Sequence, residues 1–258
     1  MRIKPNWVIT IVLTVIYMAI VGAVWAVNDV DYLTVGDSAE NILAGVIVPV
    51  GLGAIFLAVA ASVLGWWGPA LREVPRVGPR WLLLVPVIYA LAALGGLLSV
   101  DFARVDGRYV LFLAVGTLLV GFSEEMLCRG LGLVGLRGSM SEVWVWFVSC
   151  LIFGLIHALN IAFGAAVGPT VLQIGMAFLG GTVFYVVRRT TGALVWAMLL
   201  HAFWDFNTLI GSAYGATDSP ARLLSSLQYV AVLLAVVGLV IILRKGVRPD
   251  APVPQPTS

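Results

Sequence analysis

Apolar residues gather into eight long runs along this chain, separated by short polar segments. The runs cover approximately residues 7–27, 42–65, 81–100, 109–136, 144–161, 167–187, 191–210 and 223–243. A helix that crosses a bilayer needs about 20 mostly apolar residues, and each run is close to that length. The pattern therefore predicts an all-α membrane protein with eight transmembrane helices.

A few ionisable side chains interrupt these runs. They are Glu124, Glu125, Arg129, His157, His201 and Asp205. An ionisable group inside a bilayer is costly, so it must face the interior of the bundle and find a partner there. His157 and His201 are also the only histidines in the chain. We therefore expect a polar site buried inside the bundle.

Helical spacing predicts how these groups pair. Glu125 and Arg129 are four residues apart and share a helix face, which favours a buried ion pair. Glu124 points about 100° away and has no such partner, so it is left to face the histidines. His201 and Asp205 are also four apart, so the aspartate can orient the imidazole.

The composition agrees with a membrane protein. Hydrophobic residues make up 61% of the chain and charged residues 11%, whereas a soluble domain has about 25% charged residues. The net charge of +2 is too small to indicate nucleic-acid binding, so we expect no nucleic-acid partner. Cys128 and Cys150 lie in apolar runs, which predicts reduced thiols that serve packing.

Basic residues indicate the orientation. The polar segments on the side of the two termini hold eleven of them, whereas the alternating segments hold three, namely Arg104, Arg108 and Arg222. Because basic segments stay in the cytoplasm, both termini are predicted to be cytoplasmic. We therefore expect a multi-pass protein of the bacterial inner (cell) membrane, in contact with the lipid bilayer. The proline-rich tail at 246–258 is predicted to be disordered.

The three spans that carry Glu124, His157 and His201 bring them to similar depths. At 1.5 Å per residue they lie about 18, 20 and 15 Å from the cytoplasmic ends of their helices. A desolvated glutamate can take a proton from water, and histidines can position that water or stabilise an oxyanion. The same three residues could instead bind a divalent metal such as zinc, which would acidify the water.

Three motifs resemble those of a known family of intramembrane proteases. Residues 124–129 read Glu-Glu-x-x-x-Arg, residues 153–157 read Phe-x-x-x-His, and residues 201–205 read His-x-x-x-Asp. In this order, each within an apolar run, they resemble the CAAX protease and bacteriocin-processing (CPBP, or Abi) family. The resemblance covers about 109–210.

This resemblance implies an intramembrane endopeptidase, similar to CAAX prenyl protease 2, that acts on a membrane-embedded or membrane-associated peptide or protein. It implies that Glu124 is the general base and that His157 helps it activate water. His201 and Asp205 would form the oxyanion side, and Glu125 with Arg129 would hold the site together. The CAAX-processing branch has Asn where this chain has Asp205, and an aspartate donates a hydrogen bond only when protonated.

The chain divides by these features into four parts. Residues 1–108 hold helices one to three, 109–210 hold the family-like core with helices four to seven, 211–245 hold the last helix, and 246–258 form the tail. Asn160 and Gln173 are predicted to hydrogen-bond between helices. Two other functions stay open: a proton-coupled transporter, since buried Glu and His relay protons, and a non-catalytic membrane scaffold or immunity factor.

Overall fold

The computed structural model describes residues 1–73 and 75–246, and this part of the chain is helical with no strand. Eight helical spans are long and apolar enough to cross a membrane. They are Trp7–Val27, Ala39–Leu64, Arg80–Leu97, Gly107–Arg137, Glu142–Ala162, Val167–Thr191, Leu194–Tyr214 and Pro220–Arg244. The prediction of an all-α membrane protein with eight spans is confirmed.

Several spans are built from more than one helical segment. The uninterrupted ones are α1 (Trp7–Val27), α10 (Val167–Thr191) and α11 (Leu194–Tyr214). The second span joins α2 (Ala39–Ile42), the π-helical η2 (Leu43–Ile47) and α3 (Val48–Leu64). The third joins η3 (Arg80–Leu83) to α5 (Leu84–Leu97), and the eighth joins η7 (Pro220–Ser226) to α12 (Leu227–Gly246).

The two spans that carry the first two motifs are also composite. The fourth consists of α6 (Gly107–Glu125), the π-helical η5 (Met126–Leu131) and α7 (Gly132–Arg137). The fifth consists of α8 (Glu142–Leu155), the 3₁₀ segment η6 (Ile156–Ala158) and α9 (Leu159–Ala162). Short helices η1 (Tyr32–Thr34), α4 (Trp67–Leu71) and η4 (Phe102–Arg104) lie between spans.

Large apolar side chains cover the outside of the bundle. Val15, Ile55 and Leu111, for example, are each more than half exposed. Such a broad apolar surface is expected where lipid tails, not water, surround the protein. Together with the eight apolar spans, it identifies a multi-pass membrane protein.

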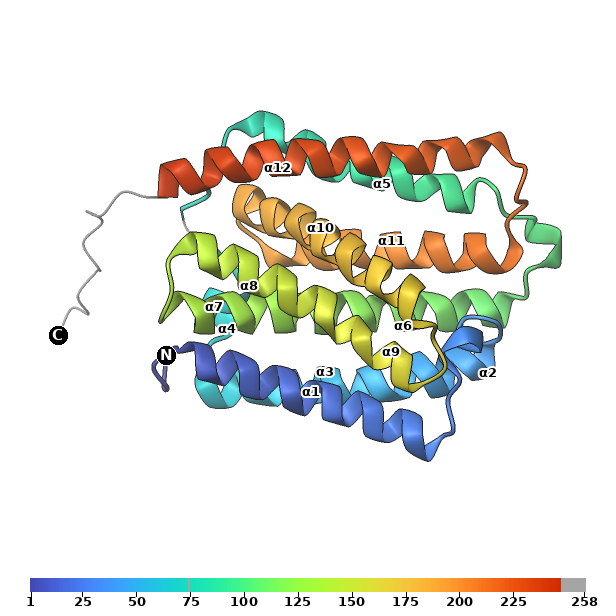
Figure 1. The fold of residues 1–258 in the computed structure, drawn as a ribbon, viewed down its shortest axis with the longest axis horizontal. Coiled ribbons are helices and arrows are strands. Elements are labelled where there is room, and N and C mark those ends of the chain that lie inside the picture. Colours follow the sequence, from blue (N-terminus) through green and yellow to red (C-terminus); the bar gives the residue numbers. More distant parts are fainter. Residues whose placement is uncertain (74, 247–258) are drawn as a thin grey trace.

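The helices run side by side, so the connections gather at two ends of the bundle (Figure 1). The N-terminus and the end of α12 lie at one end, which we call the terminal end. There the backbone N–H of Arg2 donates to the carbonyl of Leu64 at 3.0 Å. At the opposite end, the N–H of Tyr32 donates to the carbonyl of Phe163 at 2.9 Å.

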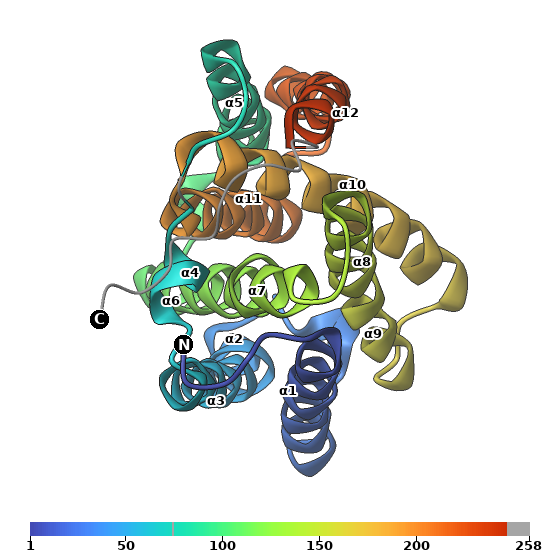
Figure 2. The same cartoon turned by 90° about the vertical axis from the view of Figure 1, so that its left-hand side faces the viewer.

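Figure 2 shows α6 and α7 in the middle of the bundle, with α11 on one side and α3 on the other. The helices α8 and α10 cover a third side. The three motif-bearing spans therefore meet around one interior region, because α6, α8 and α11 all border it.

Most span boundaries shift by up to three residues, and the ends of the sixth and seventh spans shift by four. The predicted sixth span ends at residue 187, but α10 continues to Thr191, so Arg188 and Arg189 are helical and buried. The bundle tolerates these two buried charges because Glu73, in the connection between the second and third spans, pairs with both arginines at 3.2 and 2.5 Å. Likewise α11 extends past residue 210 because Tyr214 packs edge-on against Tyr109, with ring centroids 4.9 Å apart. The predicted disordered tail lies outside the described residues beyond Gly246, which ends α12.

Gly121 lets α6 and α11 approach closely. A Cβ atom at this position would lie 3.0 Å from the backbone nitrogen of Ala202 and would also collide with the carbonyl oxygen of Met198. Since both of those atoms belong to the backbone of α11, neither can move without shifting the helix. Gly121 therefore sets the distance between the helix that ends in the two glutamates and the helix that carries His201.

We expect Gly121→Ala to destabilise the protein by about 1–3 kcal/mol, the usual cost of overpacking. Gly51→Ala is the matched control, because a Cβ there meets only Leu119 Cδ1 at 3.8 Å and alanine is the better helix former. Thermal unfolding of both variants in detergent measures the difference. An equal stability of the two variants would contradict this account of α6 and α11.

Candidate functional site

The buried ion pair predicted for the fourth span is present. Arg129 Nη1 donates to Glu125 Oε1 at 2.9 Å, and both side chains are fully buried. Glu125 is the last residue of α6, and Arg129 lies in the π-helical η5 that follows. Single π-helical turns inside α-helices are frequent at functional sites.

Glu125 has a second partner that helical spacing does not reveal. Its Oε1 atom also lies 3.2 Å from Nδ1 of His201 on α11. The sequence predicts neutralisation of Glu125 by arginine alone, with Glu124 left for the histidines. In the structure, Glu125 bridges Arg129 and His201, so it links the fourth span to the seventh.

Aromatic rings enclose this charged group. The guanidinium carbon of Arg129 lies 4.0 Å from the ring centroid of Phe153, a distance at which the ring face attracts a cation. Phe184 stacks on His201 with centroids 4.8 Å apart. Gly181 makes room for the group, since a Cβ there would touch Arg129 and lie 3.2 Å from Phe153 Cδ1.

Both ring nitrogens of His201 face carboxylates. Nδ1 faces Glu125, while Nε2 lies 3.4 Å from Asp205 Oδ2 and 4.0 Å from Glu124 Oε2. A carboxylate accepts hydrogen bonds, so the arrangement is satisfied when both nitrogens carry a proton. In that state both nitrogens donate and neither accepts, and Asp205 is in the place expected for a residue that orients the ring.

His157 has a different environment. Its Nδ1 lies 3.0 Å from the carbonyl oxygen of Phe153 one turn earlier. Because a carbonyl only accepts, Nδ1 carries the proton, and in the neutral ring Nε2 keeps a free lone pair. The side chain is presented by the 3₁₀ segment η6. His157 can therefore accept a hydrogen bond, whereas His201 can only donate.

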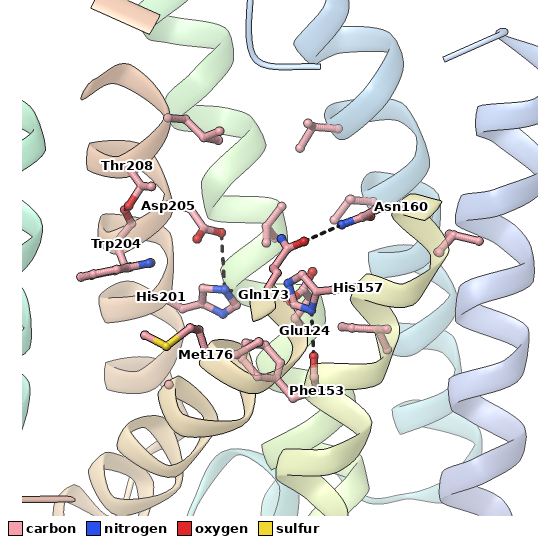
Figure 3. Close-up of a pocket in the computed structure, with 18 of the residues that line it drawn as sticks. Glu124, Phe153, His157, Asn160, Gln173, Met176, His201, Trp204, Asp205 and Thr208 are labelled. Atoms are coloured by element: carbon pink, nitrogen blue, oxygen red, sulfur yellow. Dashed lines mark hydrogen bonds and ion pairs between the residues drawn. The ribbon is translucent and has the colours of Figure 1, made fainter. Parts of the chain in front are cut away.

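These side chains converge on one cavity of about 430 Å³. Glu124, His157, His201 and Asp205 all line it, and Figure 3 draws them around a common space, with Glu124 beside His157. Glu124 Oε2 is buried and has no hydrogen-bond partner among the described residues. Such an oxygen needs a partner from a water molecule or a ligand. The arrangement can thus hold a water between the Glu124 carboxylate and the two histidine rings.

The same stretch of chain matches a known family. Residues 106–207 match the family model described as type II CAAX prenyl endopeptidase Rce1-like. This segment is Rce1-like. The resemblance predicted from the three motifs is confirmed, and its extent is close to the predicted 109–210. No curated protein and no solved structure matches the chain.

The predicted site residues all lie within the Rce1-like segment, but much of the cavity wall comes from outside it, including Tyr32. Asn160 Nδ2 donates to Gln173 Oε1 at 3.2 Å, as expected for a bond between helices, and Gln173 Nε2 donates to the Tyr32 hydroxyl at 3.1 Å. Burial raises the pKa of Tyr32 above its ordinary value. Tyr32 was missed by the sequence analysis because it lies in a connection between spans, far from any motif.

The Rce1-like segment does not present a three-ligand metal site as it is folded. Within residues 1–73 and 75–246, no three His, Cys, Asp or Glu side chains are arranged to hold an ion. Of the predicted set Glu124, His157 and His201, the last has both ring nitrogens directed at carboxylates. Cys128 and Cys150 are free and buried, as predicted.

We expect Arg129→Met to destabilise the Rce1-like segment by about 3–5 kcal/mol, because it leaves Glu125 buried with only His201 as its cationic partner. Arg108→Met is the matched control: Arg108 pairs with Glu40 on the exposed surface, where an ion pair contributes at most about 1 kcal/mol. Chemical unfolding in detergent compares the two. A loss for Arg129→Met no larger than that for Arg108→Met would show that the buried pair is not required.

Proposed function

We propose that this protein is an intramembrane endopeptidase of the CPBP, or CAAX-protease-like, family that hydrolyses a peptide bond with a glutamate-activated water. The observation that supports it best is the unpartnered oxygen of Glu124 in a cavity shared with His157, His201 and Asp205. The Rce1-like match over residues 106–207 supports the same class of reaction. Its substrate is a membrane-embedded or membrane-associated peptide or protein, with no nucleic-acid partner.

In the proposed reaction, a water molecule lies between Glu124 and Nε2 of His157. Glu124 accepts one proton, the water oxygen attacks the scissile carbonyl carbon, and His157 accepts a hydrogen bond from the second O–H and so orients the attack. The carbonyl oxygen becomes an oxyanion in front of His201, whose charge stabilises it. Glu124 then donates its proton to the leaving amine as the C–N bond breaks, so the carboxylate is regenerated.

Asp205 has a supporting role in this reaction. As a carboxylate it cannot donate to the oxyanion, but it lies 3.4 Å from Nε2 of His201. It therefore keeps the imidazole protonated and oriented, and Glu125 does the same from Nδ1 at 3.2 Å. The proposed division is that Glu124 and His157 act on water, while His201 acts on the substrate oxygen.

We also propose the orientation that the basic residues predict, with both termini in the cytoplasm of a bacterium and the protein in its inner membrane. The eleven basic residues of the terminal-side segments support it, against three on the opposite side. The two alternative functions, a proton-coupled transporter and a non-catalytic scaffold or immunity factor, have no further observation in their favour.

Glu124→Gln should abolish cleavage of a natural membrane substrate, a loss of at least about 100-fold for a general base, while the protein stays folded because the Glu125–Arg129 pair is untouched. Glu40→Gln, an exposed glutamate at the surface, should keep full activity. Quantitative membrane proteomics of cells with each variant identifies the peptide that is no longer trimmed. Unchanged trimming in Glu124→Gln would reject the peptidase proposal in favour of a non-catalytic role.

Activity should persist in the presence of a metal chelator, because no three His, Cys, Asp or Glu side chains of residues 1–73 and 75–246 are arranged to hold an ion. The measurement is cleavage by the purified protein in detergent before and after chelation, with elemental analysis of the protein for zinc. Loss of activity on chelation and its return with zinc or cobalt would instead establish the metal-dependent mechanism.

A further inference from the structure

The cavity extends from the middle of the bundle toward one end only. Its floor is formed by Glu124, His201 and Phe184, which lie near the middles of their spans. From there the lining continues through Asn160 on α9 to Tyr32 in the connection between α1 and α2. That connection lies at the end of the bundle opposite the terminal end (Figure 1).

Between this floor and the terminal end lie buried side chains. Arg129 lies on that side of the floor and is fully buried, as are Val187 and Leu194. Farther out, Glu73 pairs with Arg137 at 3.2 Å and fastens the connection after α3 to the ends of the fourth and sixth spans. A second cavity lies on this side, lined by Arg76 and Leu200 among others, but neither Glu124 nor His201 lines it. The cavity that holds Glu124 therefore does not continue to the terminal end.

Exposure and polarity both increase toward the other end. The side chain of Glu125, behind the floor, is fully buried, whereas those of Glu124 and Asp205 are 16% and 27% exposed. Thr208, one turn beyond Trp204 on α11, lines the cavity and is exposed. The hydrogen-bonded side chains of Asn160 and Gln173 also line this part of the cavity. Such polar groups can hydrogen-bond to water or to the backbone of a peptide that enters here.

We infer that substrate reaches this site from the extracytoplasmic face, and that the substrates are exported polypeptides or the extracytoplasmic segments of membrane proteins. The inference rests on the proposed peptidase function and on the proposed orientation of the termini. The cavity opens toward the end opposite the terminal end, so substrate enters there. The excess of basic residues assigns the terminal end to the cytoplasm, which places the entrance on the extracytoplasmic side. Substrates confined to the cytoplasm are excluded by this geometry.

Cysteine labelling tests the side of access without requiring activity. The two native cysteines are buried, so Thr208→Cys and Ser139→Cys each supply one accessible thiol. Ser139 is exposed and lies at the terminal end, where its Oγ accepts from the backbone N–H of Trp7 at 3.2 Å. A membrane-impermeant maleimide should label Thr208→Cys in spheroplasts and Ser139→Cys only in inverted vesicles. The wild type should stay unlabelled in both. Labelling of Thr208→Cys only in inverted vesicles, or in neither preparation, would overturn the inference.

Proteomics of the Glu124→Gln strain then tests the substrate class. The segments that fail to be trimmed should lie on the extracytoplasmic side of their parent proteins. If trimming is lost only in cytoplasmic segments, the substrate assignment is wrong while the peptidase function stands. If no segment changes although the labelling is as expected, the proposed function fails and the direction of access is retained.

Discussion

The hydrogen bonds that hold Glu125 between Arg129 and His201 are the interaction on which the rest of the site depends. A carboxylate taken out of water is expensive, and it is tolerated only when good partners surround it. Here the partners come from η5 and α11, so satisfying the charge also fixes two spans against each other. Phe153 and Phe184 exclude water from the group, which strengthens each contact.

This arrangement leaves Glu124 as the carboxylate without an arginine partner. Glu125 lies between Arg129 and His201, and Asp205 lies beside the other ring nitrogen of His201. Glu124 faces the cavity with one oxygen that no described residue hydrogen-bonds. The two histidines differ in their partners: Nδ1 of His157 lies against a backbone carbonyl, whereas both ring nitrogens of His201 face carboxylates.

The sequence was informative about features that depend on residues close together in the chain. The length of the apolar runs predicted all eight spans, and the four-residue spacing predicted the Glu125–Arg129 and His201–Asp205 contacts. What could not be predicted are the contacts between spans. Spacing within one helix cannot reveal that Glu125 lies beside His201 on another span. Likewise, the hydropathy of Arg188 does not reveal that an ion pair with Glu73 allows the arginine to be buried. The place of Tyr32 in the cavity wall could not be predicted for the same reason, because its contact with Gln173 joins two distant parts of the chain.

The composite spans explain why the positions of the candidate site residues could be predicted in outline but not in detail. A regular helix was predicted through residues 109–136 and 144–161, whereas the structure inserts a π-helical segment after Glu125 and a 3₁₀ segment around His157. Both changes redirect side chains that follow them. Hydropathy marks the polar residue in each segment, Arg129 in one and His157 in the other, but it does not indicate the change in winding.

The wide turn of η5 accommodates one residue more than an α-helical turn, as the bond from the Gly132 N–H to the Leu127 carbonyl five residues earlier shows. Deleting one residue between Met126 and Leu131 would let the chain return to ordinary winding without turning the helix beyond it, because the wide turn already absorbs that residue. Arg137 and its ionic partners would keep their places, whereas the side chains inside η5 would shift relative to Glu125. The extra residue therefore affects the position of Arg129 and leaves the rest of the span where it is.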